Sequence, residues 1–291
     1  MKNKFKLLLV FVLLLVICTA CSNDSKTDGA ENNNKKNNEG YEVSEILLYD
    51  KNNEYNGKIA FKYNSKEHIT RQTKYDKTDK IIDDYTTTFT YLDDGRISSK
   101  LLEGYSYIGS VNGKKYDIYE YHIYNWDDSG KIAYVTKNYK EYMGDTETQV
   151  YDNKGRIIEE TYGSYTDYYT YKKNEHIRKT YYAMDNETTY YVKKYDDNEN
   201  VIKEENYTVS GTNNYKKEDL VDYTVYEYKN KDKLDYVAKS YSSSDELLNY
   251  TIAKYDDNKI DYRYERYDKN GNLLMAYKYI HKPIEELIEE R

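Results

Sequence analysis

A short unit recurs along this chain of 291 residues, and the repetition constrains the fold more than any other feature. Each copy begins with an aromatic residue, continues with five mostly polar residues rich in Asp, Asn and Gly, and closes with Ile, Leu or Val. The copies are Tyr63–Ile69, Tyr75–Ile81, Tyr91–Ile97, Trp126–Ile132, Tyr151–Ile157, Tyr171–Ile177, Tyr195–Val201, Tyr228–Leu234, Tyr241–Leu247, Tyr267–Leu273 and, one residue shorter, Tyr255–Ile260. Asp and Asn accept turn geometry and Gly reaches positive φ without strain, so each unit predicts a turn between two strands.

The segments between the units alternate as strands do. Tyr85, Phe89 and Tyr91, for example, are separated by threonines at every second position. We therefore expect an all-β fold: a repetitive antiparallel hairpin or meander array, either an open twisted sheet or a shell, in one repeat domain over residues 41–280. Pro283 and the acidic-apolar run after it predict a short C-terminal helix within residues 281–291.

Tyrosine replaces the usual aliphatic core. Leu, Ile, Val and Phe make up about 16% of the residues from Ser22 onward, a share typical of disordered chains. The chain also has 41 tyrosines, all from Tyr41 onward. Each ring can bury on the order of 150–250 Å² while its hydroxyl stays wet. We expect these rings to form most of a thin, sheet-like core.

The N-terminus has the pattern of an export signal. Three lysines precede an apolar run from Leu7 to Ile17, and Thr19 and Ala20 place small residues before Cys21. The run is too short for a membrane span of about 20 residues. We expect residues 1–20 to be a signal peptide that is cleaved directly before Cys21, which then becomes the modified first residue. The alternatives are an ordinary signal peptide, cleaved without modification of Cys21, and an uncleaved membrane anchor. Residues 21–40 have no aromatic residue and predict a disordered tether.

This N-terminal pattern resembles bacterial lipoprotein signal peptides, although Cys18 stands where they usually carry an aliphatic residue. The resemblance implies a lipid on Cys21 and a domain anchored outside the cytoplasm to the bacterial cell membrane. Ser22 after the modified cysteine permits outer-membrane sorting in a cell with two membranes.

Tyr151-Asp152-Asn153-Lys154-Gly155-Arg156-Ile157 and Tyr267-Asp268-Lys269-Asn270-Gly271-Asn272-Leu273 resemble the YD repeat of Rhs-type bacterial proteins and teneurins, whose consensus is roughly Tyr-Asp-x-x-Gly-x-Leu. That resemblance implies β-hairpin shells that enclose cargo and, in some members, bind carbohydrate. Pro283 is the only proline, so the family's proline-containing boundary before a C-terminal toxin is missing. Toxin caging is therefore not expected here.

Charge and cysteine content exclude several classes of function. The net charge is −8, and removal of residues 1–20 with their three lysines takes it to −11. Nucleic acid is therefore not expected as a partner, because it requires a positive face. Cys18 and Cys21 are the only cysteines and belong to the export signal, so no disulfide or thiol chemistry is expected in the folded part.

No catalytic residues, metal or cofactor are predicted. His68 and His176 occupy the same repeat position without the second histidine that a zinc site needs. The Asp-rich turns lack the remaining ligands of a calcium loop. Adjacent acids such as Asp83 and Asp84 point to opposite faces of a strand and cannot share a site. A hydrolase, with two carboxylates facing each other in a cleft, is a less favoured alternative.

Aromatic residues between 116 and 126 are the candidate ligand-stacking side chains. We expect Tyr116 and Tyr124 on one face of a strand and Tyr119 and Tyr121 on the other, with Trp126 at its end. One aromatic face is then available to stack on a sugar or peptide. The alternative is a cross-strand tyrosine ladder, which stabilises a sheet by about 0.2–1 kcal/mol per pair.

These features together predict a non-enzymatic, lipid-anchored binding or scaffolding protein of the cell envelope, with a surface or wall glycan as its ligand. The alternative partner is another envelope protein, as for an immunity or accessory lipoprotein that binds a secreted polymorphic toxin. The negative charge of the chain suits a basic protein partner.

Overall fold

The computed structural model describes residues 40–106, 116–139, 147–162, 165–182, 184–229, 235–256 and 260–288. The strands in these ranges are β1 (Tyr41–Tyr49), β2 (Tyr55–Tyr63), β3 (Ile69–Tyr75), β4 (Ile81–Tyr91), β5 (Ile97–Ser106), β6 (Tyr116–Trp126), β7 (Ile132–Tyr139), β8 (Glu147–Tyr151), β9 (Ile157–Tyr162), β10 (Tyr165–Lys172), β11 (Glu175–Tyr182), β12 (Glu187–Tyr195), β13 (Val201–Ser210), β14 (Leu220–Tyr228), β15 (Tyr236–Ser242), β16 (Leu247–Tyr255), β17 (Tyr262–Asp268) and β18 (Leu273–Pro283). Two 3-10 turns, η1 (Lys217–Asp219) and η2 (Ile284–Glu286), complete the structure. Neither helical segment in these ranges has the length and hydropathy to cross a bilayer.

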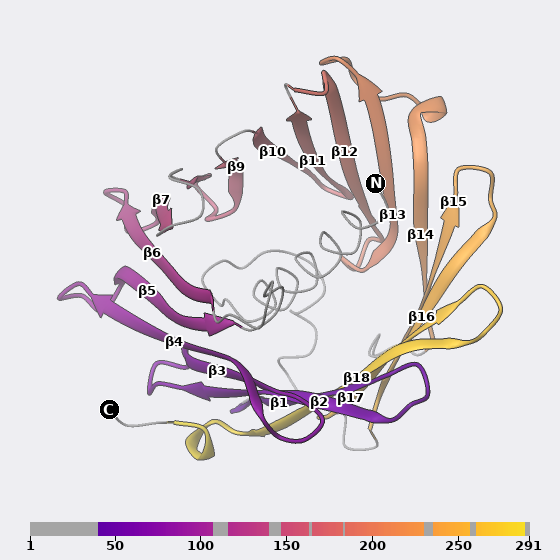
Figure 1. Ribbon diagram of the computed structural model, residues 1–291. Helices are drawn as coiled ribbons and strands as arrows, with labels where there is room; N and C mark the ends of the chain where they lie inside the picture. The colour runs from indigo at the N-terminus through magenta and orange to yellow at the C-terminus, as the bar shows by residue number, and fades with distance from the viewer. Residues whose placement is uncertain are drawn as a thin grey trace.

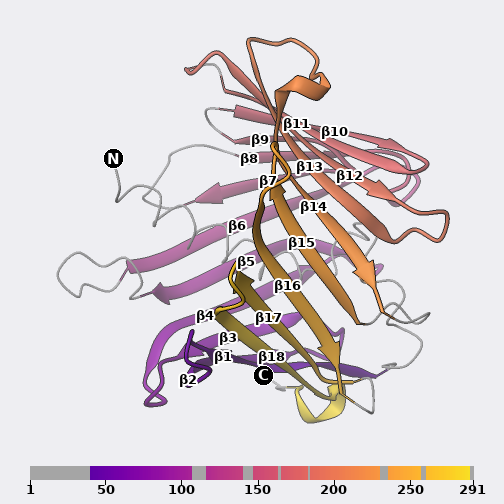
Figure 2. The same ribbon diagram turned by 90° about the vertical axis from the view of Figure 1, so that its right-hand side faces the viewer.

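The sheet closes on itself. Each strand pairs antiparallel with the next along the chain, and β1 also pairs with β18, with Tyr41 opposite Pro283 and Ile46 opposite Tyr279. Figure 1 shows the resulting ring, in which the first and last strands lie side by side, and Figure 2 shows the strands running obliquely across its wall. The prediction of an all-β antiparallel array is confirmed. The prediction of an open twisted sheet or a shell is wrong, because pairing of the two terminal strands leaves a barrel without an edge.

The repeated units form the hairpin turns that the sequence predicts. Tyr151 ends β8 and Ile157 begins β9, and the register shifts by one residue at this junction. Between them, Asp152 Oδ1 accepts hydrogen bonds from the backbone amides two and four residues on, at 2.8 and 3.0 Å. Gly155 supplies the left-handed conformation, with φ of +77°. The groups that stabilise this turn therefore all lie within the repeated unit itself.

One unit folds differently, and two lie partly outside the described residues. In Tyr171–Ile177, β10 continues to Lys172 and β11 begins at Glu175, so the turn is shorter than the unit. Residues 230–234 and 257–259 belong to the units that begin at Tyr228 and Tyr255.

The C-terminal helix predicted within residues 281–291 is present, in the described part of that range, only as the three-residue 3-10 helix η2. β18 continues to Pro283, because its last residues pair with the start of β1. Only the 3-10 turn η2 follows, and the backbone carbonyl of Leu287 then accepts a hydrogen bond from the amide of Tyr63 at 3.1 Å. Sheet pairing on both sides of η2 limits the helix to this one turn.

The two faces of the ring differ in exposure. Asp83 and Asp167, whose side chains point to one face, are 1% and 4% exposed. Ile123 and Tyr168 point to the other face and are 39% and 47% exposed. Side chains on the concave side of a curved sheet crowd together and those on the convex side spread apart. The face that carries Asp83 and Asp167 is therefore the inner one, and strand alternation assigns the rest.

Among the described residues, the core forms three separate clusters in which tyrosine shares the packing with aliphatic residues. The buried members are Ile46, Ile59, Phe61, Tyr63 and Leu287 in the first cluster, Ile97, Tyr124 and Val135 in the second, and Tyr190, Val192 and Tyr207 in the third. Small clusters of this kind fit a single-layered wall.

Ion pairs lie on the outer face of the barrel, both between neighbouring strands and along one strand. Examples are Lys58–Glu45 at 2.8 Å, Arg71–Asp84 at 2.8 Å, Lys194–Glu205 at 2.8 Å and Arg263–Glu265 at 2.7 Å. An Arg or Lys at a lipid-facing position near the middle of a bilayer destabilises a barrel by about 2–4 kcal/mol, and an Asp or Glu destabilises it by less. The ion pairs of Lys58 and Arg71 therefore disfavour contact of this part of the outer wall with lipid.

Candidate functional site

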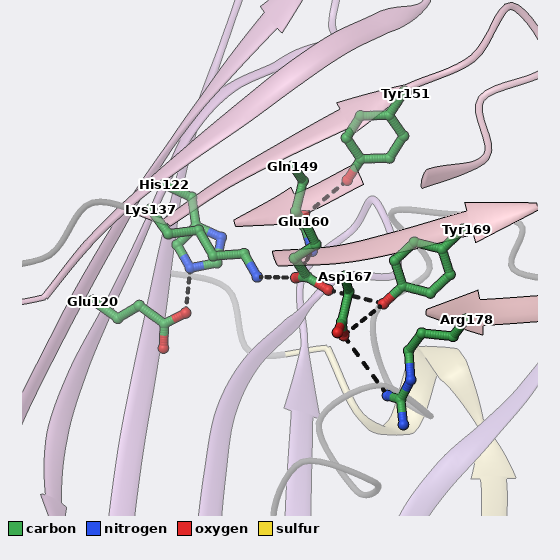
Figure 3. A network of polar contacts seen from close by, with 9 residues as sticks. All are labelled: Glu120, His122, Lys137, Gln149, Tyr151, Glu160, Asp167, Tyr169 and Arg178. Carbon is green, nitrogen blue, oxygen red and sulfur yellow. Dashed lines mark hydrogen bonds and ion pairs between the residues drawn. The ribbon is translucent and has the colours of Figure 1, made fainter. Parts of the chain in front are cut away.

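Two regions of the inner face bring polar side chains together. The first is a hydrogen-bonded network on β6 to β11, and the second is a hollow on β14 to β17. Figure 3 shows the network, in which nine side chains from neighbouring strands point toward one another.

Glu160 of β9 lies at the centre of the network. Its Oε1 accepts hydrogen bonds from Lys137 Nζ at 3.1 Å and from Gln149 Nε2, and its Oε2 accepts one from Tyr169 Oη at 3.2 Å. Tyr151 Oη in turn donates to Gln149 Oε1 at 2.9 Å. Burial raises the pKa of the Glu160 carboxyl, but Lys137 and the hydrogen bonds outweigh it and hold the pKa below its ordinary value. The Glu160 side chain is therefore an ionised carboxylate whose two oxygens both accept hydrogen bonds from neighbouring side chains.

Asp167 lies directly opposite Glu160 on β10. Its Oδ1 accepts a hydrogen bond from Thr180 Oγ1, and its Oδ2 lies 3.5 Å from Tyr169 Oη and 3.9 Å from Arg178 Nη1. Burial raises the pKa of this carboxyl, and these contacts do not offset the effect. Two carboxyl groups on facing residues thus have pKa values shifted in opposite directions.

A histidine–glutamate pair ends the network on β6. His122 Nε2 donates a hydrogen bond to Glu120 Oε1. Burial lowers the pKa of His122 despite this carboxylate. The Glu120 pKa is held below its ordinary value, because the contacts with His122 outweigh burial. At neutral pH this pair joins a neutral imidazole to a charged carboxylate.

The network is closed to substrate. Glu160 and Asp167 are both less than 10% exposed, and the oxygens that a reaction needs are occupied by neighbouring side chains. A glycoside hydrolase needs room for the sugar and a water molecule between its two carboxyl groups. The arrangement is therefore suited to holding six strands in register on the inner face.

The hollow is an open depression in the inner face. It has a volume of about 220 Å³, and its lining residues are Thr224, Tyr226, Tyr236, Ala238, Ser240, Asn249, Thr251, Tyr264 and Arg266. Register places Tyr226, Ala238, Thr251 and Arg266 in one row across four strands. Strand spacing makes this row about 14 Å long from end to end. The small side chains of Ala238 and Thr251 form the floor, and larger side chains stand at both ends.

Tyrosine rings form the walls of the hollow. The rings of Tyr226 and Tyr236 lie 5.7 Å apart between centroids, and those of Tyr264 and Tyr277 lie 6.0 Å apart. Tyr226 Oη donates a hydrogen bond to Glu204 Oε2 at 2.9 Å, outside the hollow. Burial raises the pKa of Tyr226 and Tyr236, so both phenols stay neutral at physiological pH. Neutral rings beside hydroxyl and amide groups suit a ligand with both apolar and hydroxylated faces.

The predicted stacking aromatics are separated by the barrel wall. Tyr119 and Tyr121 face outward, and Tyr119 is 36% exposed. Tyr124 faces inward and is buried in the second core cluster. Trp126 packs against that cluster and donates a hydrogen bond from Nε1 to the carbonyl of Ile97 at 2.8 Å. The side chain of Tyr116 lies outside the described residues, as do residues 1–20 and Cys21.

Sequence reasoning missed both the network and the hollow. Ala238, Ser240, Asn249 and Thr251 carry no motif, and they meet only through the register of β15 and β16. No three His, Cys, Asp or Glu side chains gather as a metal site would require within the described ranges. The hollow can therefore be recognised only from the strand register, which places small residues of neighbouring strands side by side between tyrosines.

Comparison with known proteins finds likeness only at the level of the fold. No family model and no curated protein matches the sequence. A porin-like protein from Bacteroides uniformis is 10% identical, with a TM-score of 0.41 over 82% of this chain and 96% of the other. A porin-like protein from Bacteroides vulgatus is 10% identical, with a TM-score of 0.31 over 83% and 98%. TcdB2–TccC3 without its hypervariable C-terminal region is 11% identical, with a TM-score of 0.32 over 80% of this chain and 15% of that one. With TM-scores below 0.5, these likenesses carry no functional conclusion.

Proposed function

We propose that this protein is a non-enzymatic binding module of the cell envelope, anchored by a lipid on Cys21, that takes a glycan in the hollow of its inner face. The observation that carries the proposal is the row from Tyr226 to Arg266, with its floor of small side chains between tyrosine rings. Aromatic rings pack against the apolar faces of sugar rings, and the side chains of Ser, Thr and Asn form hydrogen bonds with the hydroxyl groups of the sugar.

Two further features support a binding role for a protein whose barrel stands in water. The Glu160–Asp167 pair is enclosed by its hydrogen-bond partners, which disfavours hydrolysis at that position. Ion pairs such as Lys58–Glu45 cover the outer wall, so attachment to a membrane is better served by a lipid than by the wall itself.

A glycan-array screen with the full-length protein, purified from membranes in detergent, tests the proposal. We expect binding to at least one wall or surface saccharide, confirmed by titration calorimetry. Tyr236→Ala removes a ring from the hollow and is expected to weaken that binding about two- to tenfold, because an aromatic contact contributes about 0.5–1.5 kcal/mol.

Tyr168→Ala is the matched control, because Tyr168 is an exposed tyrosine of the outer face. It is expected to leave the affinity unchanged. A flat array, or equal losses from Tyr236→Ala and Tyr168→Ala, would contradict a glycan site in the hollow. Binding of a protein partner instead would favour the accessory-lipoprotein alternative.

A further inference from the structure

The hollow contains a single charged group. Of the nine residues that line it, Arg266 alone is charged, and the other eight offer hydroxyl, amide, methyl or phenol groups. Arg266 is half-buried on β17, at the end of the row opposite Tyr226. A cation held in a partly buried site favours an anion as its partner.

Arg266 differs from the other arginines of the described part of the chain. Those arginines pair with carboxylates of the protein: Arg71 with Asp84, Arg96 with Asp94, Arg156 with Asp152, Arg178 with Asp167 and Arg263 with Glu265. Within the described ranges Arg266 makes no ion pair or hydrogen bond, although 52 acidic residues outnumber the basic ones in this chain. Its five N–H donors are thus available to a ligand.

We propose that the hollow binds an acidic saccharide and that Arg266 receives the carboxylate of the sugar. This inference rests on the proposed function and names the class of glycan. The planar guanidinium donates two parallel hydrogen bonds to a carboxylate, which a neutral sugar cannot accept in the same way. The net charge of −8 repels anions at long range, so selectivity for an acidic sugar has to come from this local group.

Matched pairs of saccharides test the inference with the full-length protein in detergent. The pairs are oligomers of galacturonate and galactose, oligomers of glucuronate and glucose, and N-acetylmuramate and N-acetylglucosamine. We expect one acidic member to bind at least about tenfold more tightly than its neutral counterpart. Arg266→Ala is expected to weaken binding of that acid about ten- to a hundredfold and to weaken binding of its neutral counterpart by clearly less. Arg266→Lys keeps the charge without the planar fork and is expected to restore only part of the affinity.

Arg263→Ala is the matched control, because it removes the same charge from the opposite face of the same strand. It is expected to leave the preference for the acid intact. Equal affinity for acidic and neutral sugars would overturn this inference and leave the proposed function standing. Equal effects of Arg263→Ala and Arg266→Ala would also overturn it, because the cause would be net charge. No binding to any of the six probes would overturn this inference, and together with a flat glycan array it would overturn the proposed function itself.

Discussion

The facing carboxyl groups of Glu160 and Asp167 predict opposite effects of the same chemical change. Both residues are less than 10% exposed and lie in register on β9 and β10. Burial opposes ionisation of both. For Glu160, Lys137 and the hydrogen bonds outweigh burial and lower the pKa, whereas for Asp167 burial prevails and raises it. The ionised form therefore stabilises the fold at one position and destabilises it at the other.

Neutral isosteres separate these effects. At pH 7, Glu160→Gln leaves the Lys137 ammonium without its carboxylate, and we expect a loss of about 3 kcal/mol in the free energy of unfolding. Asp167→Asn keeps an acceptor for Thr180 and removes a charge that burial disfavours. We expect this substitution to stabilise the protein, by no more than about 1 kcal/mol.

The two effects also depend on pH in opposite senses. The lowered pKa of Glu160 gives stability that is present above its ordinary value of 4.5 and is lost as the pH falls through the lowered value. The cost of Glu160→Gln should therefore shrink in acid. The raised pKa of Asp167 stabilises the folded state most at a pH below 3.8, the ordinary pKa of the group. That stabilisation is lost as the pH rises through the raised pKa. The benefit of Asp167→Asn should therefore be largest at neutral pH.

Urea unfolding at pH 7 and near pH 3, followed by the fluorescence of Trp126, measures both effects, since Trp126 is the only tryptophan. Glu159→Gln is the control, because Glu159 is the neighbouring residue on the outer face of β9; it should change stability by no more than about 0.5 kcal/mol. Equal destabilisation by Glu160→Gln and Asp167→Asn at pH 7 would refute the reasoning. So would a cost of Glu160→Gln that is the same at both pH values.

Three further predictions concern close approach, turns and export. Gly104→Ala should cost at least about 2 kcal/mol in urea unfolding, because its Cβ would lie 2.1 Å from the carbonyl oxygen of Asp84; unchanged stability would contradict this packing. Asp152→Ala should cost about 1–2 kcal/mol in the same assay, because it removes the acceptor of two turn amides, and wild-type stability would show that the turn does not need it. Cys21→Ala should abolish incorporation of radiolabelled palmitate in growing cells, and continued labelling would exclude this residue as the lipid site.

The hairpins follow from the sequence because their determinants are local. A turn such as the one after Tyr151 needs only Asp152 and Gly155 within a few residues. Strand alternation also predicts correctly that Asp83 and Asp84 separate: Asp83 is buried on the inner face, and Asp84 bonds Arg71 on the outer face. Successive side chains of a strand point to opposite faces in any sheet, so this separation can be predicted without knowing the whole fold.

Closure and the inner sites do not follow from the sequence. Pairing of Tyr41 with Pro283 joins residues at opposite ends of the chain, and no local signal encodes the number of strands that closes a ring. Alternation divides each strand into two faces but does not say which one is concave. Glu160 and Glu159 therefore look alike in the sequence, and so do Arg266 and Arg263, although in each pair one residue faces inward and the other outward.

Because β1 pairs with β18, the same ring of strands can be built from a polypeptide that begins and ends at a different turn. Gly40 and Ile284 are joined by a backbone hydrogen bond of 2.8 Å, so a peptide linker from Ile288 back to Gly40, which keeps Leu287 in the first core cluster, would replace the present ends. New ends in the tight turn at Lys173 and Asn174 would leave every ladder of the barrel intact. A circularly permuted gene is thus expected to encode the same architecture.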